Sequence, residues 1–396
     1  MSGTMKLAQP HPAGKLFPSR IQWISLVALA AYIAILFVDV PLLDPDEGLH
    51  AAIAQEMVDT GDWVSPRILG EPFLDKPILY FWALCTSLSL FGSNEFAIRL
   101  PGIFFALLSI AGCWFAARLW FGRRSALFAT CIQATTLLPF AASQAAVHDV
   151  PLATWTIASL IALWSIPTDP TTASRLWMSV LASSLFLGLA ILTKGMVGVA
   201  FVMLAYVPAA LLTRRLPFFQ LIRLLALIGT LACIVASPWF LWMEWRNPGY
   251  LHYYFYIRHI IGFLAPTKWH GTREWWYYLP ILLGGGLPWT PYLCGAVRQF
   301  FADRHSSTPI PGQAERILLW CWLIIGILFL SAAKAKLASY CLPLFPPIAL
   351  LVADLWDRGL NGELHPTTWT FQRYLAATLT LLAPLAGPLI WILAIS

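Results

Sequence analysis

Apolar runs of about twenty residues recur along the whole chain, and this feature constrains the fold most. A helix needs roughly 17–25 mostly apolar residues to cross a hydrocarbon core of about 30 Å. Measured against that length, the sequence predicts spans at 21–40, 99–117, 125–147, 150–167, 176–193, 196–213, 219–240, 277–297, 316–333, 339–356 and 373–395. Hydrophobic residues make up 59% of the 396 and charged residues only 11%. The expected fold class is therefore an all-α polytopic integral membrane protein with about 11 transmembrane helices.

The composition also excludes other classes of protein. A soluble enzyme or a disordered scaffold would carry more charge. The seven cysteines are an odd number and lie in apolar runs without CxxC spacing, so we interpret them as buried small hydrophobes rather than as a disulfide framework. The net charge of +6 does not indicate nucleic acid as a partner, because no run of basic residues with interleaved aromatics occurs.

The apolar segment 77–92 decides the predicted topology, because it is short for a span. If it lies along the interface as an amphipathic helix, most of the 25 Lys and Arg fall on one side of the membrane. The positive-inside rule then predicts a cytoplasmic N-terminus and interfacial helices in the first outer loop. The span 21–40 lacks a cleavage site and is expected to remain as an anchor. We expect one domain over 1–396, with outer loops at 41–98 and 241–276 and no soluble C-terminal domain.

Ionisable residues gather on the predicted outer side. They are Asp44, Asp46, Glu47, Asp75, Lys76, Asp149, Lys194, Lys334 and Lys336. A single such residue is more simply a snorkelling charge at a helix end, but chance would scatter several of them over both sides. Lysines at a membrane surface can hold a lipid phosphate, and a carboxylate beside them can accept a proton or bind a metal. The pattern therefore indicates a polyprenyl-phosphate-linked sugar that enters from the lipid bilayer.

Seven ordered blocks resemble one known family. They are DPDEGLHAAIAQEMVDTGDWVSPRILGEPFLDKPILYFW with LFGSNEFAIRLPG, then HDVPLATW, LTKG, YLHYYFYIRHIIGF, HGTREWWYYLP, LPWTPYL and SAAKAKLASYCLPLFP. Over roughly 40–350 the chain is similar to the bacterial lipid A aminoarabinose transferases, which belong to the GT-C superfamily with the protein mannosyltransferases. The resemblance implies a GT-C-like fold and an undecaprenyl-phosphate-sugar-dependent glycosyltransferase of the bacterial inner membrane, with an active site that faces the periplasm.

The resemblance also implies roles for individual residues. The family's Asp-Glu pair falls on Asp46 and Glu47, and Asp149 matches an acid at the start of a span, so these three are the catalytic candidates. The candidates for binding the lipid phosphate and the substrate are Lys76, Lys194, Arg258, Lys336 and Tyr340. His259 matches a His that can join a carboxylate, here Asp75 or alternatively Asp149, in a divalent metal site for zinc or magnesium near the lipid carrier.

The chain departs from the family at several of these positions. The family has an Arg-Tyr pair where this chain has Leu49-His50, an acid where Arg258 stands, and an Arg where Gly262 stands. Arg258 can restore the positive charge that is missing at Gly262, but from a different angle. The identity of the sugar and of the acceptor, whether lipid A or another envelope glycan, therefore stays open.

In the predicted reaction, an acceptor attacks the anomeric carbon and the lipid phosphate leaves, stabilised by Lys76. Asp46 is the base if the acceptor is a hydroxyl. The alternatives are a protein O-mannosyltransferase-like enzyme with a protein acceptor, and a non-catalytic polyprenyl-lipid flippase. Structural roles also stay open: Asp46 or Asp149 as an N-cap, Glu47 as a first-turn acid, and Asp75 with Lys76 as a surface pair.

Overall fold

The computed structural model describes residues 46–167, 173–264, 273–304 and 310–378, together with Ala30 and Leu42. Except for Ala30, the predicted span 21–40 lies outside these residues, as does most of the span 373–395. The regular structure of the described chain is helical apart from a hairpin, in which β1 (Arg67–Ile68) pairs antiparallel with β2 (Glu71–Pro72).

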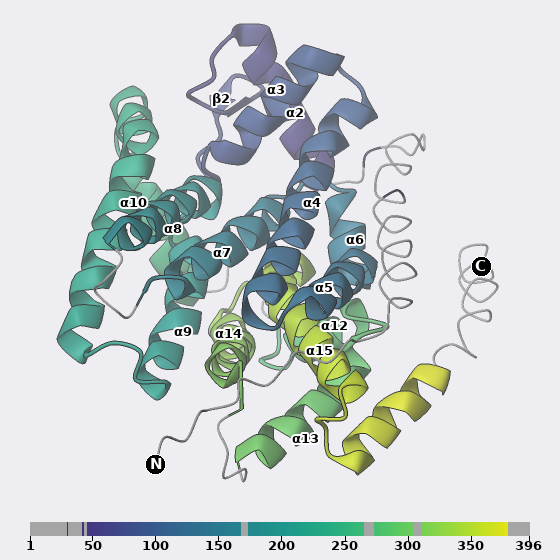
Figure 1. Cartoon of the computed structure of the whole chain (residues 1–396). Helices are drawn as coiled ribbons and strands as arrows, with labels where there is room; N and C mark the ends of the chain where they lie inside the picture. Colours follow the sequence, from purple (N-terminus) through teal and green to yellow (C-terminus); the bar gives the residue numbers. More distant parts are fainter. Residues whose placement is uncertain are drawn as a thin grey trace, which may run out of the picture.

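The long apolar helices form a bundle around a continuous hydrophobic core (Figure 1). They are α4 (Glu95–Trp120), α8 (Ala173–Lys194), α10 (Phe218–Arg246), α14 (Gln313–Ala332) and Ala338–Leu360, which joins the 3-10 helix η4 (Ala338–Leu344) to α15 (Phe345–Leu360). By length and composition, these five helices of the described chain are long enough to cross a membrane. Two more apolar helices, α7 (Asp149–Trp164) and α9 (Met196–Leu212), are shorter. The fold class is therefore the expected all-α polytopic one.

Helix ends follow local capping chemistry that hydropathy does not register. The span predicted at 99–117 begins earlier in the structure, because the Asn94 side chain caps α4 by accepting a hydrogen bond from the Ala97 backbone N–H at 2.9 Å. Gly92, with φ +80°, ends the preceding helix α3 (Leu79–Phe91).

The span predicted at 125–147 is a broken one. It consists of α5 (Arg123–Thr135) and α6 (Leu137–Ser143), which are bent by 62° relative to each other. Pro139 accounts for the break. It has no backbone N–H to donate to the carbonyl of Thr135, and its ring would collide with that carbonyl in a continuous helix.

The prediction of one continuous span at 277–297 is wrong. The structure has α12 (Tyr278–Gly285), the 3-10 turn η3 (Thr290–Tyr292) and α13 (Leu293–Arg304) in its place. Three consecutive glycines at 284–286, followed by Pro288 and Pro291, remove helix propensity and backbone donors within eight residues. Mean hydropathy over about twenty residues does not reveal such breaks, so the sequence predicted a single span here.

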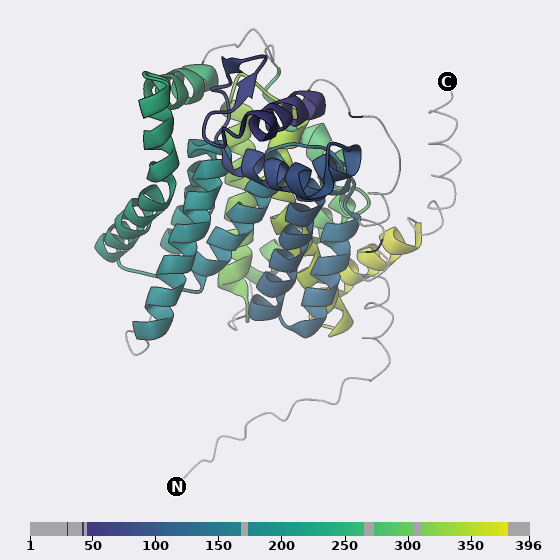
Figure 2. The same ribbon diagram turned by 90° about the horizontal axis from the view of Figure 1, so that it is seen from above.

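The helix α2 (Asp46–Thr60), the β1–β2 hairpin and α3 form a cap at one end of the bundle. Figure 2 shows α2 and α3, in purple and blue, lying across the ends of the upright helices. With 13 residues, α3 is about 20 Å long and too short to cross the hydrocarbon core. Its placement agrees with the interfacial helix predicted for 77–92. We call this end of the bundle the cap end.

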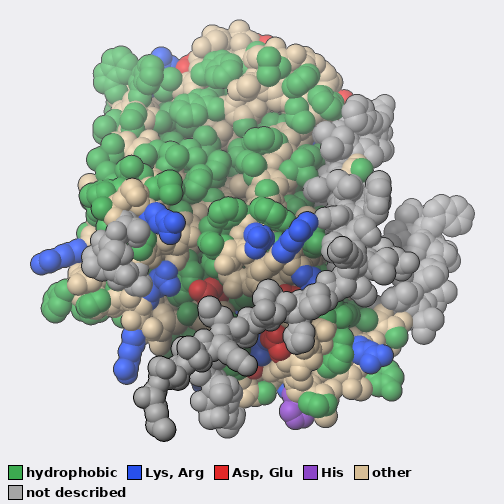
Figure 3. All heavy atoms as spheres, in the orientation of Figure 1, with side chains coloured by type: hydrophobic (Ala, Val, Ile, Leu, Met, Phe, Trp, Pro, Cys, Tyr) green, Lys and Arg blue, Asp and Glu red, His purple; other side chains and the backbone are tan. Residues whose placement is uncertain are grey.

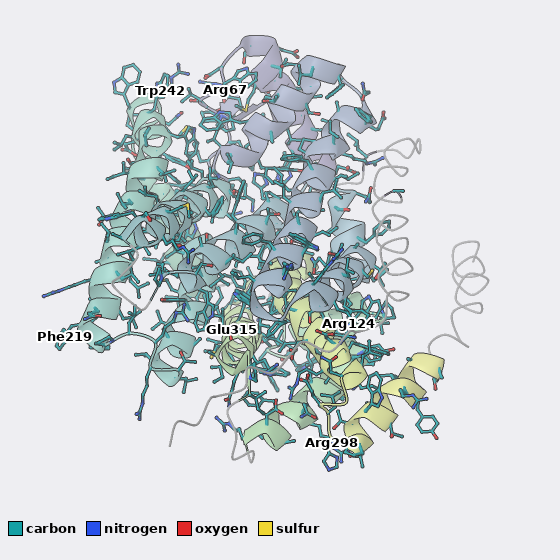
Figure 4. All side chains as sticks on the ribbon, in the orientation of Figure 1. Arg67, Arg124, Phe219, Trp242, Arg298 and Glu315 are labelled. Carbon is teal, nitrogen blue, oxygen red and sulfur yellow. The ribbon has the colours of Figure 1, made fainter. Side chains whose placement is uncertain are left out.

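The helix α10 is peripheral along most of its length but tied to the cap at one end. Outward-facing Ile234 and Leu241 are more than half exposed, as expected of a side chain that faces lipid. Figure 4 places Phe219 and Trp242 at opposite ends of this helix. Near Trp242, Arg246 pairs with Asp62 at 2.7 Å and the Trp239 indole donates to the Val64 carbonyl at 2.9 Å. These contacts fix α10 to the turn before β1.

The opposite end of the bundle carries its own buried ion pairs. Arg316 binds Asp354 through two hydrogen bonds of 2.7 and 2.9 Å, and Arg358 binds Asp303 in the same way. Figure 3 shows Lys and Arg side chains gathered over the middle and lower part of the face in view, while hydrophobic side chains cover its upper part. The end of the bundle with these Arg–Asp pairs is thus distinct from the cap end.

Candidate active site

A cavity of about 150 Å³ lies between the cap and the bundle. Its polar lining residues are Asp75, Lys76, Asp149, Lys194, Tyr254, Arg258, His259 and Tyr340. The topology explains their convergence: α7 begins at Asp149 and α8 ends at Lys194, so these residues lie at the same end of adjacent antiparallel helices. The structure thus brings together seven residues predicted as site candidates, plus Tyr254.

Two of these residues neutralise each other. The Lys194 ammonium forms an ion pair with Asp149 Oδ1, and the Ser339 hydroxyl donates to Asp149 Oδ2 at 3.0 Å. The ammonium also lies over the Tyr340 ring, 3.9 Å from its centroid. The N-cap alternative for Asp149 is wrong, because His148 occupies the cap position and the Asp149 carboxylate bonds side chains instead. Lys194 is therefore the counter-ion of Asp149.

Asp75 is bound by a segment far away in the sequence. Its carboxylate pairs with Arg258 at 3.1 Å and accepts a hydrogen bond from the Tyr253 hydroxyl at 2.6 Å. Both partners belong to the π-helix η2 (His252–Ile261), which covers the cavity. The alternative that Asp75 and Lys76 form a surface ion pair with each other is wrong, because the Asp75 carboxylate pairs with Arg258 instead.

Lys76 differs from the other cations of the cavity. Among the residues that the structure describes, no carboxylate or other acceptor bonds its ammonium. Burial and, after it, the charge of Lys194 lower the pKa of Lys76 to about 8. Lys76 is thus a desolvated cation that an anion entering the cavity would stabilise.

Gly195 allows the α8–α9 turn to touch the π-helix. It has φ +65°, and a Cβ built on it would lie 2.7 Å from both His259 Nε2 and the Tyr254 hydroxyl oxygen. His259 is further fixed by a 2.7 Å hydrogen bond between its Nδ1 and the Tyr254 carbonyl. Only glycine satisfies both the backbone conformation and the close approach. The LTKG block therefore positions a neighbouring segment as well as supplying Lys194.

Three predicted site residues lie outside the cavity lining. Asp46 opens α2 and is exposed, and its carboxylate forms no hydrogen bond with the described residues, so no N-cap bond is present. The buried Glu47 carboxylate pairs with Arg99 at 3.1 Å. The Lys336 ammonium donates to the backbone carbonyls of Ala333 and Arg273.

The two candidate metal ligands both line the cavity, but each is already engaged by protein groups. The Asp75 carboxylate is occupied by Arg258 and Tyr253, and the two ring nitrogens of His259 face the carbonyls of Tyr254 and Lys194. A zinc site needs three or four protein ligands. Within the described residues, no group of three or more His, Cys, Asp or Glu is arranged to hold a metal ion. The metal therefore stays a sequence-based prediction.

Sequence reasoning missed the residues that hold the charged side chains in place. Tyr253 and Ser339 bond Asp75 and Asp149, and Tyr254 lines the cavity. Tyr253 and Tyr254 stand in the block YLHYYFYIRHIIGF, and Ser339 precedes Tyr340. Hydropathy does not single out hydroxyl groups in aromatic or apolar runs. Only the position of these residues within segments that resemble the family could have indicated them.

The fold is similar to that of known polytopic membrane glycosyltransferases of the GT-C class. Residues 75–242 match the family described as dolichyl-phosphate-mannose-protein mannosyltransferase. The crystal structure of ArnT from Cupriavidus metallidurans bound to undecaprenyl phosphate aligns with a TM-score of 0.79 and 27% identity, over 95% of this chain and 66% of that one. An Archaeoglobus fulgidus oligosaccharyltransferase shares the fold alone, with a TM-score of 0.54 and 12% identity over 93% of this chain and 52% of that one.

Curated relatives specify which glycosyltransferases the chain resembles. An undecaprenyl phosphate-alpha-4-amino-4-deoxy-L-arabinose arabinosyl transferase of Aeromonas salmonicida is 35% identical over 351 residues, which are 87% of this chain and 62% of the relative. The enzyme of the same name from Pectobacterium carotovorum is 37% identical over 81% of this chain and 56% of its own. The chain is thus similar in sequence and in fold to the undecaprenyl-phosphate aminoarabinose transferases. It spans less than two thirds of the length of these curated relatives.

Proposed function

We propose that the chain transfers a glycosyl group from a polyprenyl phosphate to an envelope acceptor such as lipid A or another glycan. The single observation that carries the proposal is Lys76, a cation to which none of the described residues offers a bonded acceptor, in a cavity that also has an apolar side. Leu152, Val197, Phe329 and Leu330 line that side and suit an isoprenoid chain. The names of the relatives and the bound lipid of the Cupriavidus structure support the same donor.

In the proposed reaction, an acceptor oxygen attacks the anomeric carbon of the donor. A new carbon–oxygen bond forms as the bond between that carbon and the phosphate oxygen breaks, and the electron pair leaves with the lipid phosphate. Lys76 stabilises the charge on this phosphate, and Arg258 can shift toward it from Asp75. A hydroxyl acceptor passes its proton to a base, for which exposed Asp46 is the candidate, whereas an acceptor that is already a phosphate anion needs none.

We further propose that the cap end faces the periplasm of a bacterial inner membrane. The helix ends away from the cap carry Arg123, Arg124, Arg214 and Arg215, in agreement with an excess of basic residues on the cytoplasmic side. A lipid-linked donor would then reach the cavity from the outer leaflet.

The proposal is tested by sugar transfer in proteoliposomes. We expect purified protein to release undecaprenyl phosphate from an undecaprenyl-phosphate aminoarabinose donor when lipid A is present. Lys76→Met should lower the rate by about 10²–10³, as does removal of one oxyanion donor. The matched control is Lys334→Ala, because Lys334 is an exposed cation of the cap end that does not line the cavity.

The same assay separates the alternatives. Movement of the lipid between leaflets with its glycosidic bond intact would identify a flippase and contradict the proposal. Transfer to a peptide rather than to a glycolipid would retain the cavity chemistry but replace the acceptor. Equal rates for Lys76→Met and the unmodified chain would remove the observation on which the proposal depends.

A further inference from the structure

A buried histidine next to a cavity residue in the sequence is not used by the proposed reaction. His148 is 2% exposed and immediately precedes Asp149. Its ring packs edge-on against the rings of His50, Tyr80 and Phe81, at centroid distances of 4.6, 5.0 and 5.0 Å. Neither of its ring nitrogens has a hydrogen-bond partner in the described part of the chain. A buried polar atom without a hydrogen-bond partner lowers the free energy of unfolding by about 1–3 kcal/mol, so each such atom calls for an explanation.

Lys76 and His148 complement each other chemically. The Lys76 ammonium offers three donors and has no bonded acceptor among the described residues, and its charge acts on His148. Tyr80, which packs against His148, lies in the first turn of α3, four residues after Lys76. Burial, reinforced by the charges of His50, Lys76 and Lys194, holds the pKa of His148 well below its usual value. A neutral imidazole has one lone pair to accept a hydrogen bond.

We propose that His148 is a positioning residue for Lys76: its neutral ring accepts a hydrogen bond from one buried water, and this water accepts a hydrogen bond from the Lys76 ammonium. The two side chains make no direct hydrogen bond, and a water with two or more polar partners is a usual bridge between buried groups of this kind. The bridge would aim the ammonium toward the head of the lipid and limit its rotamers before the phosphate arrives. This inference rests on the proposed function, because it assumes that Lys76 binds a lipid phosphate.

A shape-matched pair of variants tests the acceptor role. His148→Phe keeps a planar ring among Tyr80, Phe81 and His50 but removes the lone pair, whereas His148→Gln keeps an acceptor. The measurement is the affinity of the full chain in nanodiscs for undecaprenyl phosphate. We expect His148→Phe to weaken binding about tenfold or more, and His148→Gln to restore most of the loss. Tyr80→Phe removes another unpartnered buried oxygen of the same ring cluster and should leave the affinity unchanged.

A double-mutant cycle with Lys76→Met separates positioning from general damage to the fold. If His148 acts through Lys76, His148→Phe has no further effect on affinity in the Lys76→Met background. An equal loss in both backgrounds, or a His148→Gln variant as weak as His148→Phe, would overturn the inference. Failure of the unmodified chain to bind undecaprenyl phosphate would instead contradict the proposed function itself, so the two failures are distinguishable.

Discussion

At the residue scale, the charge state of Lys76 sets the chemistry of the cavity. Its neighbours Asp75, Asp149 and Lys194 are all engaged in ion pairs, whereas the Lys76 ammonium is bonded by none of the described residues. Because the pKa of Lys76 is lowered to about 8, the side chain is charged below that pH and neutral above it. A bound phosphate favours the charged form and raises this pKa again. Binding above pH 8 therefore requires uptake of a proton.

The affinity for undecaprenyl phosphate should accordingly fall as the pH rises above about 8. The expected slope is up to about tenfold per pH unit, because each unit of pKa is worth a factor of ten. Titration of binding between pH 7 and 10 measures it. Lys76→Arg, whose guanidinium stays charged over this range, is the control and should show a flat profile. An unchanged slope in Lys76→Arg would mean that another group titrates.

At the scale of elements, the contact between the α8–α9 turn and the π-helix η2 fixes His259 and Arg258 over the cavity. Gly195→Ala should both strain the turn at φ +65° and push His259 away. With φ +65° and ψ −139°, Gly195 lies near a backbone region that is essentially restricted to glycine, where a residue with a Cβ pays about 1–3 kcal/mol. We expect a lower Tm together with a loss of sugar transfer.

Gly61→Ala separates these two effects. Gly61 has nearly the same φ, +67°, but nothing lies within 4 Å of a Cβ built on it. Because of its positive φ, this variant should also lose stability in thermal unfolding, while its transfer rate stays near that of the unmodified chain. If both variants lost transfer equally, backbone strain rather than contact with His259 would be the cause.

At the scale of the whole molecule, the two ends of the bundle have separate electrostatic roles. Asp354→Asn leaves the buried Arg316 without its charge partner, and breaking a buried pair costs about 3–5 kcal/mol. The Tm in detergent should fall markedly. Glu363→Gln, at an exposed acid 3.8 Å from Arg358, should change it little. Below its Tm, Asp354→Asn should bind undecaprenyl phosphate normally, because the cavity lies at the other end.

The orientation of the molecule gives a further test. Leu69 is 93% exposed at the tip of the cap hairpin, and exposed Gln220 lies in the first turn of α10, next to Phe219 (Figure 4). With Cys233 and Cys294 replaced by alanine, Leu69→Cys should react with a membrane-impermeant maleimide on spheroplasts. Gln220→Cys should react only after permeabilisation. The reverse pattern would place the cavity on the cytoplasmic side.

Much of the architecture could be predicted from the sequence, because transfer of a helix into lipid depends on the summed hydropathy of neighbouring residues. The helices α8, α9 and α14 therefore lie close to their predicted spans. The breaks at Thr136 and at glycines 284–286 are written in the sequence as Pro139 and as a Gly–Pro cluster, but an average over twenty residues hides them. The resemblance to a known family marked most of the cavity residues.

The sequence by itself determined that this chain is a membrane helix bundle with its ionisable residues toward one side, since both follow from local solvation. Only the tertiary structure decided how those charges combine. Lys194 pairs with Asp149, 45 positions away, and Arg258 pairs with Asp75 across 183 positions. These pairings leave the Lys76 ammonium without a bonded acceptor among the residues that the structure describes. Coulomb energies depend on separations of a few ångströms in a low-dielectric interior, and helix packing alone sets those separations.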